Sequence, residues 1–193
     1  MFFLLLIVMV MVFFVSSAFA RANYEVVEAL TGDVNAFPLL KSLVVEKLGP
    51  PDSVETMTGF PYPTEIYAVD GSDELSHVYF VYNLEESGEP TYAVGVVMKE
   101  EMGMNVANTL SEAEKAGMGS VVVLHGSTFA IFDLFAGMTK EPLWVIVEDR
   151  EFQGETVFSS TLISPKNTLP YIEGTYGEEA RKLLEKAMEG RTQ

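Results

Sequence analysis

The chain has 193 residues, no cysteine and only two histidines. The absence of cysteine excludes disulfide bonds, thiolate metal sites and cysteine nucleophiles. Basic residues are also scarce: 12 Lys and Arg stand against 28 Asp and Glu, a formal net charge of −16. Nucleic-acid binding depends on clusters of Lys and Arg that neutralise phosphates, so we expect no nucleic-acid partner. An acidic surface instead favours basic protein partners or cations.

Charge is entirely absent from residues 1–20, which are almost all apolar. About 20 apolar residues in a helix span the hydrocarbon core of a bilayer, so this segment is long enough for a membrane anchor. It also ends in Ala18-Phe19-Ala20, and small residues at the first and last of these positions are typical of signal-peptidase cleavage. The alternatives are a cleaved signal peptide, a retained anchor and a buried helix of a soluble protein.

This contrast in polarity predicts two parts of the chain. We expect a signal peptide or transmembrane anchor at residues 1–20, followed by a single acidic domain at residues 21–193. The second part is long enough for one hydrophobic core. The protein is then extracytoplasmic or membrane-anchored, with membrane contact through residues 2–20 if that segment is not cleaved.

Strand patterns are concentrated in the middle of the chain. Residues 77–82 and 91–98 are rich in β-branched and aromatic side chains and flank a polar link, which predicts a β-hairpin. Gly95 inside the second of these strands indicates a bulge or a close neighbour. Further strands are predicted at residues 64–69, 120–124, 143–147 and 155–163, while residues 128–136 fit either a strand or a helix.

Helices are predicted where apolar residues recur three and four positions apart. The clearest cases are residues 39–48, residues 104–116 and the segment from Glu178 to the stop at Gly190, and residues 22–31 are a further candidate. Residues 165–176 are expected to form a loop. No repeated strand–helix–strand pattern occurs, so the predicted class is α+β: an N-terminal hydrophobic helix, then one domain with a mainly antiparallel sheet and about three helices.

The predicted core consists of apolar side chains on the inward faces of these elements. They are Leu43, Val44, Phe80, Val94, Val122, Trp144, Ile146, Leu183 and Leu184.

The two histidines are the natural candidates for acid–base chemistry or metal binding. His77 and His125 each follow or begin a predicted strand, and a nearby carboxylate would complete a site. The spacings typical of zinc sites, such as H-E-x-x-H, do not occur. We keep His77 and His125 as a candidate polar site, and we predict no catalytic residue, no metal ligand and no cofactor.

Carboxylates occur in short runs that we expect in turns at strand ends. Charged residues there protect sheet edges from aggregation, and they also present negative charge to a basic partner. The candidate partner-binding residues are Glu85, Glu86, Glu89, Glu148, Asp149 and Glu151.

One stretch resembles a known family. In residues 34–99 a helix ends in Leu48-Gly49-Pro50, a loop follows, and the predicted hairpin of residues 77–82 and 91–98 comes next. This order resembles the intermembrane-space domains of the mitochondrial presequence-translocase and cytochrome-oxidase assembly-factor family. The resemblance implies a non-catalytic docking domain that one N-terminal helix tethers to the inner membrane.

These observations predict an exported or membrane-tethered domain that works by binding or assembly and has a protein partner. The resemblance gives one alternative, a subunit for translocation or respiratory-complex assembly at the mitochondrial inner membrane. The other alternative is a hydrolase or lyase that uses a carboxylate pair with His77 or His125, because carboxylate enzymes need no sequence motif. The sequence favours the non-enzymatic reading.

Overall fold

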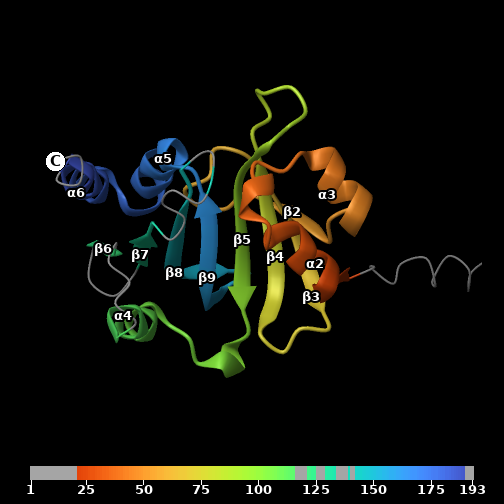
Figure 1. Cartoon of the computed structure of the whole chain (residues 1–193), viewed down its shortest axis with the longest axis horizontal. Helices are drawn as coiled ribbons and strands as arrows, with labels where there is room; N and C mark the ends of the chain where they lie inside the picture. The colour runs from red at the N-terminus through yellow and green to blue at the C-terminus, as the bar shows by residue number, and fades with distance from the viewer. Residues whose placement is uncertain (1–20, 116–120, 125–128, 134–138, 140–141, 190–193) are drawn as a thin grey trace, which may run out of the picture.

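The computed structural model describes residues 21–115, 121–124, 129–133, 139 and 142–189 (Figure 1). Within these residues the fold is α+β, with one mainly antiparallel sheet and five α-helices. The predicted class is therefore confirmed, and the prediction of about three helices was too low. The hydrophobic helix predicted at residues 1–20 lies outside the described residues. No helix in the described ranges has the length and hydropathy that crossing a bilayer requires.

The described part of the chain contributes nine strands to the sheet. They are β1 (Ala22–Asn23), β2 (Ser53–Glu55), β3 (Thr64–Asp70), β4 (Leu75–Tyr82), β5 (Thr91–Met98), β6 (Val121–Leu124), β7 (Phe129–Phe132), β8 (Trp144–Phe152) and β9 (Glu155–Ile163). Their order is β1-β3-β4-β5-β9-β8-β7-β6, and β2 also pairs with β3. Only the short β1–β3 pair is parallel among these pairs.

Two hairpins dominate the sheet. The β4–β5 hairpin confirms the predicted one, and its link of residues 83–90 projects beyond the rest of the sheet at the top of Figure 1. The β8–β9 hairpin turns on Gln153 and Gly154 alone, both with positive φ, as in the two-residue turns that match strand twist. Because this turn is so short, β8 continues to Phe152. The expectation that Glu148, Asp149 and Glu151 lie in a turn was therefore wrong.

The helices are α2 (Tyr24–Thr31), α3 (Lys41–Leu48), α4 (Val106–Lys115), α5 (Pro165–Tyr176) and α6 (Glu178–Glu189). Short 3-10 helices occur at Val34–Ala36 and Glu100–Met102. The loop predicted at residues 165–176 was wrong, because these residues form α5. Pro165 is at the helix start, where a missing N–H is not needed, and the buried side chains of Thr168, Tyr171 and Ile172 stabilise the helix through packing.

The two faces of the sheet are covered differently. On one face, which we call the α5/α6 face, Ile66, Tyr79 and Ile146 pack with residues of α5 and α6. The opposite face, which we call the α2–α4 face, carries two separate apolar clusters. One packs beneath α2 and α3, and the other beneath α4. Side chains alternate between the faces along each strand, so neighbouring residues join different clusters.

Most of the predicted core is buried. Val44, Phe80, Val94, Ile146 and Leu184 have at most 5% of their surface exposed, whereas Leu43 and Trp144 are half-buried. Leu183 is 48% exposed, which contradicts its prediction, because the stripe of α6 that contacts the sheet centres on Ala180 and Leu184. The side chain of Val122 lies outside the described part of the chain.

Candidate functional site

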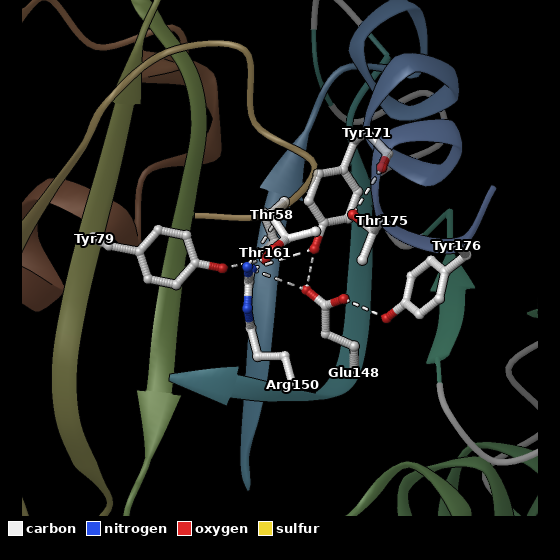
Figure 2. Close-up of polar contacts among 8 residues, drawn as sticks. All are labelled: Thr58, Tyr79, Glu148, Arg150, Thr161, Tyr171, Thr175 and Tyr176. Atoms are coloured by element: carbon white, nitrogen blue, oxygen red, sulfur yellow. Dashed lines mark hydrogen bonds and ion pairs between the residues drawn. The ribbon is translucent and has the colours of Figure 1, made fainter. Parts of the chain in front are cut away.

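Strand β8 carries two charged side chains into the α5/α6 face. Residues two apart in a strand share a face, so Glu148 and Arg150 point the same way as Ile146. β5 pairs with β9 only over residues 159–163 of β9, whereas β8 pairs along all of β9. Figure 2 shows β8 turning sharply near Glu148. After this turn the ring of Phe152 lies 5.1 Å from that of His77 on β4.

Glu148 is fully buried, and both its oxygens accept hydrogen bonds from α5 (Figure 2). The Tyr171 hydroxyl donates to Oε1, and the Tyr176 hydroxyl donates to Oε2 at 2.6 Å. Oε1 is also 3.3 Å from Nη1 of Arg150. The carboxylate therefore ties the last two turns of α5 to strand β8.

The guanidinium of Arg150 joins three segments of the chain. Nη1 lies 3.3 Å from the Tyr171 hydroxyl, and Nη2 lies 3.4 Å from the carbonyl oxygen of Thr58. Its central carbon is 5.5 Å from the ring centre of Phe60 and 5.9 Å from that of Tyr79, within cation–π range. Nε has no hydrogen-bond partner in the described residues. Only 6% of the side chain is exposed, so this charge depends on Glu148 and the aromatic rings.

Tyr79 reaches this cluster because a glycine faces it. Tyr79, Gly95 and Thr161 form one row across β4, β5 and β9. A Cβ atom on residue 95 would lie 2.1 Å from Cζ of Tyr79. Without it, the ring crosses β5 and its hydroxyl lies 2.5 Å from the Thr161 hydroxyl. The close neighbour predicted at Gly95 is confirmed.

Two tyrosines of the network, Tyr171 and Tyr176, are hydrogen-bond donors to a buried carboxylate. Burial raises the pKa of Tyr79, Tyr171 and Tyr176, and the negative charge of Glu148 raises each of them further. The phenols therefore stay protonated and act as donors. Both oxygens of Glu148 accept hydrogen bonds from described side chains, so the arrangement holds α5 against the sheet, and the fully buried carboxylate presents no surface to a substrate.

A cavity of about 470 Å³ opens elsewhere, at the end of the sheet beside the β4–β5 hairpin. Its volume falls within the range of about 300–1,000 Å³ typical of ligand sites. Apolar lining residues include Pro38, Pro90, Tyr92 and Leu143, and polar ones include Glu86. A smaller apolar cavity of about 180 Å³ lies on the α2–α4 face.

The hairpin link holds three of the predicted partner-binding carboxylates. Glu85 and Glu86 are exposed and form no ion pair in the described part of the chain. Glu89 is paired: its Oε2 lies 3.0 Å from Nζ of Lys41, which also contacts Glu65 at 3.1 Å. Glu85 and Glu86 are thus the acidic groups of the hairpin that have no ion pair among the described residues.

The other predicted carboxylates do not join them. Glu148 is buried in the network, which excludes it from a surface contact and corrects that prediction. Asp149 is half-buried and Glu151 is exposed. Glu151 precedes Phe152, which contacts His77 near the start of β4, whereas the hairpin link follows the end of β4. The two acidic runs therefore lie toward opposite ends of the sheet.

His77 is half-buried on β4, and its Nδ1 lies 3.1 Å from the hydroxyl of Ser76. Burial lowers the pKa of its imidazole, so the ring is neutral near pH 7. Among the described residues no carboxylate is hydrogen-bonded to the ring, and no group of three His, Asp or Glu side chains could hold a metal ion. His125 lies outside the described residues, so a joint site with His77 stays a prediction.

Comparison with known protein families, with curated proteins and with solved structures finds no match to this chain. The resemblance of residues 34–99 to a mitochondrial family thus stays a prediction.

The buried network was missed from the sequence. Arg150 and Tyr79 were not considered, and Tyr171 and Tyr176 were placed in a loop. The available signal was the period-two alternation of Ile146, Glu148, Arg150 and Phe152, which marks one face of a long strand. An isolated Arg two positions after a Glu on that face would then have indicated an ion pair.

Proposed function

We propose that this chain is an exported or membrane-tethered domain that works by binding or assembly and engages a basic protein partner. The observation that carries the proposal is that Glu86 lines the cavity of about 470 Å³ and that Glu85 is its neighbour in the hairpin link, both exposed and without ion pairs among the described residues. Complementary charge mainly accelerates association, while apolar contacts supply most of the affinity.

The two alternatives from the sequence have unequal support. A mitochondrial translocase or assembly subunit would be a special case of the same tethered, non-catalytic domain. A hydrolase or lyase needs an accessible carboxylate with a histidine. The carboxylate that is set in a polar network, Glu148, is sealed from solvent, and His77 contacts Ser76 and Phe152 instead. No observation therefore favours the enzyme.

The test is charge reversal at the hairpin. The full chain is purified from native membranes or medium with its partners, and association rates are compared for the native chain and the variant Glu85→Lys/Glu86→Lys. The control is Glu28→Lys/Glu101→Lys, which changes the net charge equally at two other exposed sites. We expect the association rate of the hairpin variant alone to lose most of its salt dependence. Salt screens the attraction between charges more than about 10 Å apart at 0.1 M, and this variant no longer has the carboxylates that attract the partner. Equal rates for both variants would contradict the proposal.

A further inference from the structure

The cavity beside the hairpin is built from rigid pieces. Four segments meet there: residues 37–38, the base of the β4–β5 hairpin, residues 142–143 and the start of α5. Pro38, Pro90, Pro142 and Pro165 line it, one from each segment. Proline has a fixed φ, so these walls lose little conformational freedom when a ligand binds.

The floor of the cavity is held by reciprocal hydrogen bonds. The Tyr92 hydroxyl donates to the carbonyl oxygen of Asn167 at 3.1 Å, and Nδ2 of Asn167 donates to the carbonyl oxygen of Tyr92 at 3.2 Å. These contacts fix α5 to β5. Tyr92 and Leu143 are at most 7% exposed, so the floor is apolar and well packed.

The rim is charged, and its charges are unequal. Nδ2 of Asn83 donates to Oε1 of Glu86 at 2.7 Å and orients this carboxylate, which belongs to the cavity lining. The backbone N–H of Glu85 donates to Oδ1 of the same Asn83 side chain at 3.1 Å. Among the described lining residues Lys166 is the only cation, and it is exposed. The described lining therefore holds one carboxylate, Glu86, and one ammonium group, and the exposed Glu85 next to Glu86 adds a second negative charge at the hairpin, on a chain with a net charge of −16.

We propose that this cavity receives an apolar side chain from a protein partner, and that a Lys or Arg beside that side chain pairs with Glu85 and Glu86. The inference rests on the proposed function and names the chemistry of the partner. An apolar anchor in a preformed recess, with cations at its edge, is the usual composition of an interface hot spot. The negative rim and the negative chain both select a basic segment and reject an acidic one.

The probe is the peptide acetyl-Gly-Arg-Trp-Arg-Gly-amide, titrated into the isotope-labelled full chain in a mild detergent and followed by amide chemical shifts. Acetyl-Gly-Glu-Trp-Glu-Gly-amide and acetyl-Gly-Arg-Gly-Arg-Gly-amide are the matched controls. We expect shifts in residues 83–92 and 166–167 with the first peptide only. Stronger binding of the acidic peptide, or shifts confined to other residues, would overturn the proposal.

Charge variants test whether the cavity prefers a positively or a negatively charged ligand. Lys166→Glu should tighten binding of the Arg-Trp-Arg peptide about two- to fivefold, and Glu86→Lys should weaken it by a similar factor, as for exposed ion pairs. Lys186→Glu, an exposed position on α6, is the control and should change affinity less. Weaker binding to Lys166→Glu would mean that the cavity prefers an anion, and the proposal would fail.

A blocking variant separates this inference from the proposed function. Pro142 is exposed at the rim, so Pro142→Trp should fill the mouth without disturbing the core, which an unchanged melting temperature would verify. We expect loss of the peptide and of the native partner. If the partner still binds this variant but not Glu85→Lys/Glu86→Lys, the cavity inference fails and the proposed function stands. If the partner binds both variants normally, both proposals fail.

Discussion

The two faces of the sheet hold their helices through different interactions. On the α5/α6 face a buried ion pair and two tyrosines attach a helix to bent strand β8 through directed hydrogen bonds. On the α2–α4 face the helices pack on apolar side chains, and an apolar cavity of about 180 Å³ remains. An ion pair on that face, Lys41–Glu65, is nearer to solvent, since the Lys41 side chain is 34% exposed.

The difference shows what a buried ion pair contributes. Apolar burial is favourable in many arrangements, so it tolerates the cavity beside α2. Hydrogen bonds to one carboxylate are satisfied in few arrangements, so they define where α5 lies. The desolvation cost of Glu148 and Arg150 offsets much of their attraction, and we expect that their main effect is to favour one geometry.

The largest effect is expected from breaking the ion pair. Glu148→Ala leaves the Arg150 guanidinium buried without its carboxylate, which typically costs about 3–5 kcal/mol of unfolding free energy. Glu65→Ala, which removes the carboxylate of the more exposed pair, should cost clearly less. Urea unfolding of both variants measures the difference. The double variant Glu148→Leu/Arg150→Leu should recover much of the loss; a double variant as unstable as Glu148→Ala would contradict this account.

The next effect concerns the apolar contacts of α6 on the α5/α6 face. Leu184 is fully buried, and truncating a buried Leu to Ala typically costs about 2–5 kcal/mol. Leu183→Ala is the matched control, because that side chain is 48% exposed and its loss should change stability by less than about 0.5 kcal/mol. Thermal unfolding of the two variants provides the measurement. Similar melting temperatures would show that α6 does not dock as described.

Adjacent residues of β9 compare the faces directly. Thr161→Val removes the partner of the Tyr79 hydroxyl on the α5/α6 face and should cost about 0.5–1.5 kcal/mol. Ser160→Val points into the cavity on the α2–α4 face, where added methyl groups have room, and should be neutral or stabilising by about 0.5 kcal/mol. Opposite results in urea unfolding would reverse the assignment of the two faces.

The smallest effect is a pH dependence at His77, at the edge of the α5/α6 face. Burial lowers the pKa of this imidazole below its ordinary value of 6.5. The unfolded chain therefore takes up a proton near pH 6.5 that the folded chain resists. The stability that the neutral His77 contributes is fully present above pH 6.5, and it is lost as the pH falls through the lower pKa of the folded state. Unfolding free energies of His77→Gln should fall less between pH 7 and 5 than those of the native chain. Parallel slopes would assign the acid sensitivity to other groups.

Local patterns predicted most of the strands correctly. The alternating and aromatic residues of β4, β5 and β9 make strand structure favourable wherever they are buried on one or both faces. The α6 helix followed in the same way from its apolar spacing. The helix α5 did not, because Pro165, Pro170 and Gly174 disfavour a helix locally, and only the burial of Tyr171 and Ile172 against the sheet outweighs that preference.

The sequence by itself determined the α+β class, the hairpins and an acidic surface, since these depend on composition and on neighbours along the chain. Only the tertiary structure decided which carboxylates are exposed. Glu86 and Glu148 stand in similar acidic runs, yet one lines an open cavity and the other is fully buried. The burial of Glu148 depends on the length and bend of β8 and on the packing of α5 against it. These features result from contacts between residues far apart in the chain.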